Sequence, residues 1–310
     1  MVRPVRLDFY TPINHSYAGL FQTKGYSVVR PPDNVFLDSG YLRRTSMPPR
    51  TKTAVSIVIC SLGRPDSLDA TLASLSKQTF RSFEVILITE KGHLSQLRQQ
   101  GLNAAIGDIV AFIDDDVYCE PTWLEGITQA FRKDKAVVGV TGPTVIDAAY
   151  QKNRDCLRFK GIRKLQEWLF EVPNRPSHLS RVGAPSMASN FEWCDYEGEA
   201  GYLECCNFAV NKSAGLACGG FSDAYIETSE WSELDFAFRL KQLGNLVFTQ
   251  RAKLHHRPSK AGVYVARLNT DHRWQNFMEF QRTWIKPSFK TSLYRGFVWA
   301  YLRMKSWRMI

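Results

Sequence analysis

Alternating apolar and amphipathic segments over residues 54–114 restrict the fold more than any other feature of this 310-residue chain. Three short runs are rich in β-branched residues, which predicts strands buried on both faces of a sheet. The runs are AVSIVIC (54–60), FEVILIT (83–89) and DIVAFID (108–114). Between them, leucines at helical spacing (68, 72 and 75) and the segment LSQLRQQGLNAA predict helices. This order predicts an α/β fold with a doubly wound, mostly parallel sheet, whose ligands bind at the carboxyl ends of its strands.

Charge and cysteine content limit the partners and the compartment. The chain has 40 Lys and Arg against 30 Asp and Glu, a net charge of +10, which implies an anionic partner: nucleic acid, a membrane surface or a phosphate-bearing substrate. Its seven Cys include no C-x-x-C pair, so neither a disulfide framework nor a structural zinc site is indicated. No signal peptide and no run of about 18 apolar residues is found, so we expect a cytoplasmic protein.

The chain divides into three expected parts. Residues 1–52 are rich in Pro and Arg and are expected to form an irregular N-terminal extension. Residues 53–262 are the expected α/β domain, with a further strand at 136–145 and an irregular, aromatic stretch at 150–200. Residues 263–310 form a basic, aromatic, helical segment. From Trp284 onward it suits either an amphipathic helix on an anionic membrane or an ordinary helix packed on the domain.

Three adjacent carboxylates, Asp114, Asp115 and Asp116, stand where the third expected strand ends. Carboxylates so close repel one another, and a hard divalent cation such as Mg²⁺ or Mn²⁺ would neutralise them together with substrate phosphates. In extended or turn geometry, Asp114 and Asp116 project to one side and Asp115 to the other. The alternative is an acidic turn that caps the helix expected near Pro121.

Residues 54–260 resemble the family 2 glycosyltransferases of the GT-A fold. The resemblance is carried by VSIVICSLGRP, by the spacing of SLSKQTFRSFEV, and by GDIVAFIDDD. It implies a nucleotide-binding half at 53–147 and an acceptor half at 148–262. It also implies that Asp114 contacts the ribose of a sugar nucleotide, that Asp116 ligates Mn²⁺ or Mg²⁺, and that Asp115 supports them.

The same resemblance implies further donor contacts. Ser61 and Arg64 occupy the turn that contacts the nucleotide, and Glu90 stands where the family places an acidic residue that reads the base. The surrounding Thr-Glu-Lys-Gly differs from the family's Asp-Asp-Gly-Ser, so the identity of the nucleobase is not predicted. Arg98 matches an arginine of the family and suits a phosphate, with a solvated helix face as the alternative.

Acceptor-side residues follow from the segment ETSEWSELDFAFRLKQLGN. Aligning it on Asp235 places Glu233 at the family's catalytic carboxylate, the base that deprotonates the acceptor hydroxyl. Glu230 is the substitute, and both are also favoured at a helix N-terminus by the macrodipole. In AKLHHRPS, His256 fits the position of a metal-ligating histidine, and His255 is its alternative.

The implied function is that of an inverting hexosyltransferase in polysaccharide biosynthesis. It would use a nucleotide-diphospho-sugar donor, a divalent metal and a hydroxyl of a glycan or lipid-linked glycan as acceptor. A metal-dependent nucleotidyltransferase would share the acidic pair and is the main alternative. A nucleic-acid-binding protein would fit the charge, but no helix-turn-helix, zinc-finger or RNP signature is found, so no nucleic-acid partner is expected. A peripheral position at the inner face of the membrane is the alternative to a free cytoplasmic location.

Overall fold

The computed structural model describes most of the chain, and the following refers to that part. The described residues are 20–23, 26–29, 53–61, 64–146, 149, 160–186, 195–258 and 270–307. The remainder of the expected N-terminal extension, and part of the expected C-terminal segment (263–269 and 308–310), lie outside them.

Nine strands form the central sheet. In their order across the sheet they are β1 (Leu20–Thr23), β2 (Tyr26–Val29), β4 (Phe83–Ile88), β3 (Val55–Cys60), β5 (Ile109–Asp114), β10 (Asn207–Asn211), β7 (Val137–Thr141), β11 (Asn245–Phe248) and β9 (Gly198–Glu199). β3 pairs in parallel with β4 and β5, and β7 pairs in parallel with β11. β10 is antiparallel to both β5 and β7. The strands β3, β4, β5, β7 and β11 therefore all run in one direction, and β10 runs in the opposite direction. The expected α/β class with a mostly parallel sheet is therefore confirmed.

Two strands lie within the segment that was expected to be irregular. β1 and β2 pair antiparallel, with Thr23 opposite Tyr26, and β2 extends the sheet along β4. Only two residues separate them in sequence, and the second is Gly25, a composition typical of hairpin connections. The expectation of an irregular segment is therefore wrong at residues 20–23 and 26–29.

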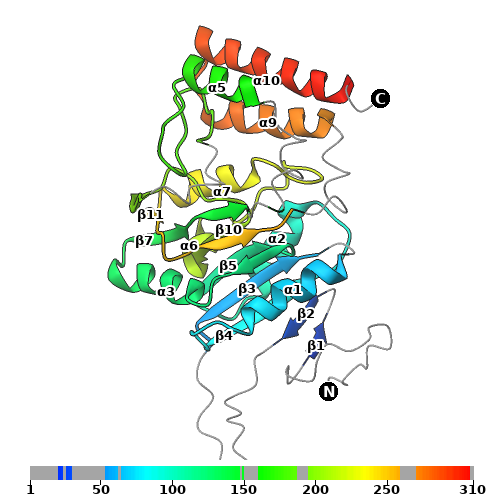
Figure 1. Cartoon of the computed structure of the whole chain (residues 1–310), viewed down its shortest axis with the longest axis vertical. Helices are drawn as coiled ribbons and strands as arrows, with labels where there is room; N and C mark the ends of the chain where they lie inside the picture. Colours follow the sequence, from blue (N-terminus) through cyan, green and yellow to red (C-terminus); the bar gives the residue numbers. More distant parts are fainter. Residues whose placement is uncertain are drawn as a thin grey trace, which may run out of the picture.

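Helices cover both faces of the sheet (Figure 1). α1 (Pro65–Leu75) and α3 (Trp123–Lys133) pack on one face, against the odd-numbered residues of β3. α2 (Leu94–Ala104), α6 (Lys212–Ala217) and α7 (Ser232–Leu240) pack on the other, where Val58 of β3 and Phe112 of β5 point. Because strand residues alternate between faces, β-branched residues at consecutive positions fill both cores, each contributing about 1.5–3 kcal/mol when fully buried.

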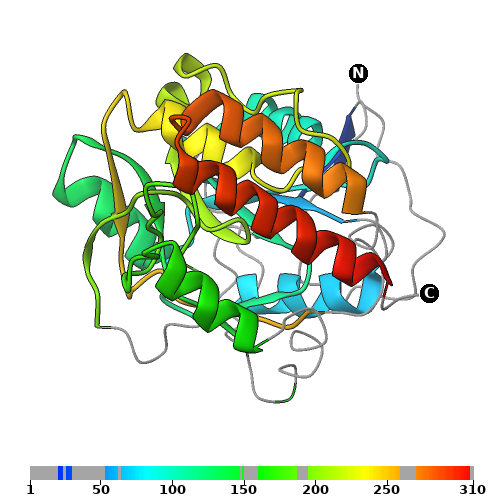
Figure 2. The ribbon, with the colours of Figure 1, turned by 90° about the horizontal axis from the view of Figure 1, so that it is seen from above.

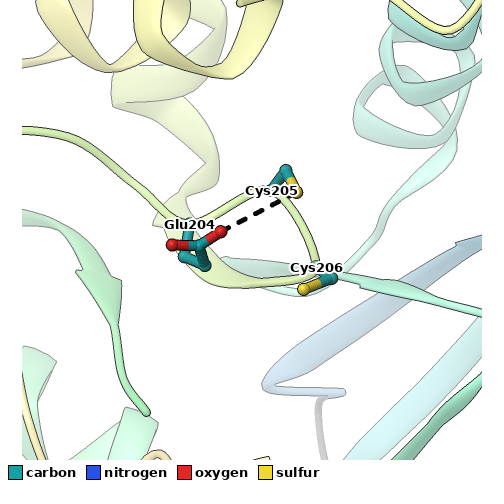
Figure 3. A group of neighbouring side chains, drawn as sticks. All are labelled: Glu204, Cys205 and Cys206. Carbon is teal, nitrogen blue, oxygen red and sulfur yellow. Dashed lines mark hydrogen bonds between the residues drawn. The ribbon is translucent and has the colours of Figure 1, made fainter. Parts of the chain in front are cut away.

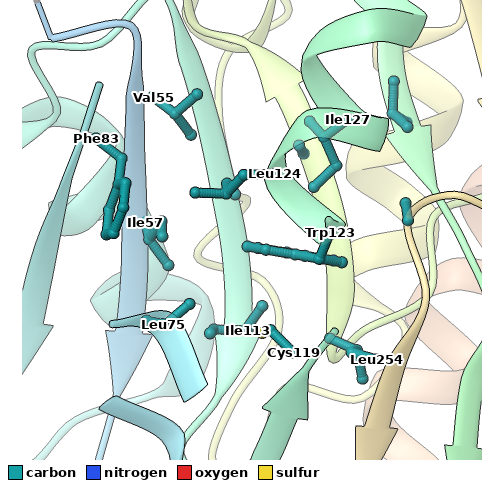
Figure 4. Close-up of a cluster of buried hydrophobic side chains, with 14 of the residues drawn as sticks. Val55, Ile57, Leu75, Phe83, Ile113, Cys119, Trp123, Leu124, Ile127 and Leu254 are labelled. Atoms are coloured by element: carbon teal, nitrogen blue, oxygen red, sulfur yellow. The ribbon is translucent and has the colours of Figure 1, made fainter. Parts of the chain in front are cut away.

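Trp123, the first residue of α3, lies in the centre of the core between the sheet and helices α1 and α3 (Figure 4). Its side chain is fully buried, and Nε1 donates a hydrogen bond to Oδ1 of Asn207, 2.9 Å away. The Nδ2 of Asn207 in turn donates to the carbonyl oxygens of Gly142, Pro143 and Ala252, at 3.1, 3.0 and 2.8 Å. One buried amide thus joins α3, β10 and the chain segments that follow β7 and β11.

Replacing Asn207 with Ala is expected to lower the free energy of unfolding by about 3 kcal/mol. The change leaves the indole N–H and three carbonyl oxygens without this partner in the core. Urea denaturation measures the effect, with Asn103→Ala on the exposed face of α2 as the matched control, expected within about 0.5 kcal/mol of the wild type. Equal denaturation midpoints for the two variants would contradict this account of Asn207.

A smaller sheet lies beside the carboxyl end of β5. Its strands are β6 (Val117–Cys119), β12 (Leu254–His256) and β8 (Thr144–Ile146), with β12 in the middle, antiparallel to β6 and parallel to β8. The single strand expected at 136–145 is instead two strands in different sheets. The chain changes sheets at Gly142 and Pro143, where a Cβ on Gly142 would lie 2.3 Å from the carbonyl oxygen of Ala252.

Three helices form a layer beyond α7. They are α5 (Lys160–Leu169), α9 (Thr270–Trp284) and α10 (Phe289–Trp307), which lie together at the end of the molecule opposite β1 and β2 (Figures 1 and 2). α9 packs on α7 through Phe280 and Trp284, which contact Phe238, and α10 packs on α9 through Tyr294 and Phe277. Within the described residues, no helix combines the length and apolarity needed to cross a bilayer.

Candidate active site

The ends of β5 and β12 bring two carboxylates and an imidazole together. β5 ends at Asp114, and β6 begins two residues after Asp115. His256 of β12 pairs with Val117 of β6, so its ring reaches Asp116, the residue before Val117. Nε2 of His256 lies 3.1 Å from Oδ1 of Asp116. One potential ligand atom from each of Asp114, Asp116 and His256 lies within 4.8 Å of the others. Two carboxylates with one imidazole suit Mn²⁺ or Mg²⁺, so the donor set fits a hard divalent cation.

Asp115 is fully buried and makes different contacts from its neighbours. The Oγ of Ser61, immediately after β3, donates to Oδ2 of Asp115 at 2.6 Å, and Arg64 also binds this carboxylate. Burial raises the pKa of Asp115 to about 6, against the opposing effects of Ser61 and Arg64. Asp115 therefore anchors the acidic turn to the end of β3 rather than joining the ligand group.

Arg64 provides positive charge to this turn. It is the residue before Pro65, which opens α1, and its Nη1 donates to Oδ2 of Asp116 at 2.6 Å. Burial alone would lower the pKa of Arg64, but the three adjacent carboxylates outweigh it and raise this pKa. Nε of Arg64 is buried without a hydrogen-bond partner among the described residues. Arg64 is thus a fixed cation at the edge of the acidic group.

Arg98 and Glu233 form a buried ion pair beside Asp114. Nη1 of Arg98, on α2, donates to Oε1 of Glu233, in the first turn of α7, at 2.7 Å. Nη2 donates to the carbonyl oxygen of Cys205 at 2.9 Å and lies 3.7 Å from Oδ1 of Asp114. Burial opposes the charge of Arg98, but Glu233 and Asp114 outweigh it and raise the pKa of Arg98. Arg98 is only 4% exposed, so the alternative of a solvated helix face is wrong.

A constrained loop sets the position of Glu233 relative to Arg98. Glu227, Ser229 and Trp231, just before α7, have positive φ angles of 53°, 47° and 77°. Such conformations cost non-glycine residues of order 1–3 kcal/mol each and persist where surrounding contacts enforce them. Here the amide N–H groups of Leu94 and Ser95 at the start of α2 donate to the carbonyl of Glu227 and to Oγ of Ser229. The loop therefore joins the N-terminal ends of α2 and α7.

Glu230 and Asp235 connect α7 with α9. Oε1 of Glu230 lies 3.1 Å from Nε of Arg273, and Asp235 accepts hydrogen bonds from Arg239 and, at 2.8 Å, from Nε1 of Trp284. The contacts with Arg273 and Trp284 are directed to the C-terminal layer. Neither carboxylate is among the residues that contact the Arg98 guanidinium.

His255 and Glu90 also lie outside the acidic ligand group. Nε2 of His255 is 2.8 Å from Oε1 of Glu120, because alternation along β12 turns this ring to the opposite side from His256. Glu90 is exposed just beyond β4, and its Oε2 accepts a hydrogen bond from Gln100 at 3.3 Å. The structure therefore brings together Asp114, Asp116 and His256, with Ser61, Arg64 and Asp115 next to them.

A second group of possible metal ligands, which the sequence reasoning did not single out, precedes β10 (Figure 3). Ligand atoms of Glu204, Cys205 and Cys206 also lie within 4.8 Å of one another, and Sγ of Cys205 is 3.9 Å from Oε1 of Glu204. A hydrogen bond with Cys205 and burial raise the pKa of the Cys206 thiol well above its usual range, and the pKa of Cys205 is also raised. Thiols bind metals as thiolates, and raised pKa values disfavour the thiolates of Cys205 and Cys206. A hard divalent cation therefore suits the group of Asp114, Asp116 and His256 better than this one.

One family model and one relative of known activity match parts of the chain. Residues 89–181 match the model of glycosyl transferase family 2, which confirms the resemblance to this family. A glucosyl-dolichyl phosphate glucuronosyltransferase of Haloferax volcanii is 27% identical over 32% of this chain. The alignment spans 40% of that relative's length, well under half of it.

Two solved structures are similar in arrangement. A mannosyltransferase, PcManGT from Pyrobaculum calidifontis, in complex with GDP-Man and Mn²⁺, is 12% identical, covers 85% of this chain and 74% of its own, and gives a TM-score of 0.48. GalNAc-T7 with UDP, GalNAc and Mn²⁺ is 11% identical; the match covers 82% of this chain and 55% of GalNAc-T7, with a TM-score of 0.47.

Proposed function

We propose that the chain is an inverting, metal-assisted glycosyltransferase of the GT-A type. It would move a hexosyl group from a nucleotide-diphospho-sugar to a hydroxyl of a glycan or lipid-linked glycan. The observation that carries the proposal is the group of Asp114, Asp116 and His256, with Glu233 joined to the same place through Arg98. The family match supports sugar transfer, and the relative that acts on a glucosyl-dolichyl phosphate supports a lipid-linked acceptor.

On the donor side, Asp116 and His256 would hold Mn²⁺ or Mg²⁺, with Asp114 either on the ribose or as a further ligand. When bound, such an ion offsets the negative charge of the departing diphosphate. Arg64 already lies against Asp116 and offers a guanidinium to the same phosphates. Ser61 fixes Asp115 beneath the turn, and Glu90 remains the proposed contact to the base.

On the acceptor side, Glu233 is the proposed base. Its carboxylate accepts the proton of the acceptor hydroxyl while that oxygen bonds to the anomeric carbon and the bond from this carbon to the diphosphate oxygen breaks. Attack from the face opposite the leaving group inverts the anomeric centre. Arg98 holds the carboxylate through one nitrogen and the Cys205 carbonyl through the other, so it positions the base beside the end of β5.

Donor binding provides the first test. We expect UDP-, GDP- or dTDP-sugars to raise the melting temperature only when Mn²⁺ is present, since the diphosphate and the acidic group repel each other without it. A donor at 100 times its Kd stabilises the protein by about 2.7 kcal/mol. Differential scanning fluorimetry of the full chain, with matched sugar 1-phosphates as controls, measures the shift.

Products distinguish this proposal from the nucleotidyltransferase alternative, which shares the acidic group. With a labelled donor and Mn²⁺, sugar transfer or slow donor hydrolysis releases a nucleoside diphosphate. Attack on the phosphorus next to the nucleoside would instead break the bond between the two phosphates and release the sugar 1-phosphate, with the nucleotide left as a monophosphate or joined to the attacking phosphate. No shift with any donor, or cleavage between the two phosphates, would contradict sugar transfer by this site.

A further inference from the structure

α10 presents one apolar face to its neighbours and a second to solvent. Tyr294 and Leu302 are buried, whereas Phe289, Leu293 and Trp299 are 87%, 45% and 48% exposed. The exposed side chains follow one another at spacings of four and six residues and lie on the side of the helix away from Tyr294. Since α10 packs on α9 beneath it, this second face points away from the sheet (Figure 1). An exposed apolar face of this length marks an interaction surface.

α5, a neighbour of α10, also carries exposed apolar side chains. Trp168 is 77% exposed and Leu165, three residues earlier, is 49% exposed. Phe170, directly after α5, packs against the rings of Tyr294 and Phe297, so α5 and α10 are neighbours, as both views show (Figures 1 and 2). The α5–α10 face is defined by Leu165, Trp168, Phe289, Leu293, Trp299 and Met304.

All the charged residues of α10, the longer helix of the α5–α10 face, are basic. α10 contains four basic residues and no Asp or Glu. The basic residues are Lys290, Arg295, Arg303 and Lys305, and Lys286 stands three residues before the helix. Lys290 and Arg303 pair with Glu171 and Asp271 on other elements, at exposed positions where ion pairs are weak and exchange readily with another anion.

We propose that the α5–α10 face lies on the surface of an anionic lipid bilayer. Exposed Trp, Phe and Leu on a helix with only basic charges are the combination that binds the boundary between headgroups and acyl chains. The negative surface of a bilayer that contains anionic lipids complements the basic charges of α10. α10, α9 and α7 are stacked in that order, so binding would place the helix that carries Glu233 at the membrane side of the molecule.

Vesicle flotation of the full chain tests the proposal without a sugar nucleotide, so its failure is distinct from a failure of sugar transfer. We expect binding to vesicles of phosphatidylcholine with phosphatidylglycerol, weak binding to phosphatidylcholine alone, and weaker binding at high salt. Phe289→Glu combined with Trp299→Glu should reduce the bound fraction about tenfold, because both side chains lose their favourable transfer into the interface.

Ile106→Glu is the matched control, since Ile106 is 50% exposed at the turn before β5, outside the α5–α10 face. It should bind like the wild type, and Lys286→Glu should lose binding mainly to the anionic vesicles. Unchanged melting temperatures show that the variants fold. Absence of binding, or equal binding by the double variant and the control, would overturn the proposal. A dimer that is lost in the double variant, with no vesicle binding, would assign the face to a second copy instead.

Discussion

Asp116→Asn is expected to lower the rate of sugar transfer about a thousandfold, the equivalent of about 4 kcal/mol of transition-state stabilisation. Asp116 is the residue that His256 and Arg64 both contact, so its charge is shared by the proposed metal site and by the nearest fixed cation. The amide keeps the shape of the side chain but is a much poorer ligand for a hard cation. Initial rates with Mn²⁺, measured by release of nucleoside diphosphate, report the effect.

The effect of Asp116→Asn has a matched comparison on α1. Asp69→Asn removes an exposed carboxylate and should leave the rate within about twofold, because surface charges contribute little. Raising the Mn²⁺ concentration should restore part of the activity of His256→Gln, which retains both carboxylates. Full activity of Asp116→Asn at ordinary Mn²⁺ concentrations would remove this residue from the site.

Glu233→Gln is expected to lower kcat by about 10²- to 10⁴-fold, the range typical of a lost general base, while the donor still binds with Mn²⁺. The amide retains a hydrogen-bond acceptor for Arg98 but cannot take the acceptor proton. Turnover with a saturating acceptor, alongside donor affinity from calorimetry, separates loss of chemistry from loss of binding.

Glu230→Gln serves as the internal control for this prediction. Glu230 contacts Arg273 of α9, so its change should affect kcat by less than about threefold, with a loss of stability instead. If Glu230→Gln abolished turnover and Glu233→Gln did not, the substitute assignment would hold and Glu233 would be a structural partner of Arg98. Equal effects on donor affinity and kcat would also contradict a role confined to proton transfer.

Local patterns were sufficient for the central strands and for the acidic turn. β3, β4 and β5 fall on the three apolar runs because continuous β-branched residues have few alternatives when helices cover both faces of a sheet. The spacing of Asp114 and Asp116 already indicated a shared side. His256 could be placed only by resemblance, since the register of β12 on β6 pairs it with Val117, 139 positions earlier in the chain.

Long-range contacts account for what could not be predicted. Nothing in the sequence near Arg98 indicates that a loop with three positive φ angles would bring Glu233 to it. The role of Asn207 depends on three carbonyl groups from separate parts of the chain. The antiparallel direction of β10 likewise follows from its neighbours, because a strand buried on both faces has the same composition in either direction.

Binding of Mn²⁺ to the group of Asp114, Asp116 and His256 can be measured directly by electron paramagnetic resonance, with UDP or GDP present. We expect one bound Mn²⁺ that requires the nucleoside diphosphate, that is lost in Asp116→Asn, and that persists in Cys205→Ser, which alters only the second ligand group. Binding that survives Asp116→Asn and disappears in Cys205→Ser would place the ion elsewhere and contradict the proposed site. No Mn²⁺ binding by the wild type with either nucleotide would contradict metal-assisted sugar transfer itself.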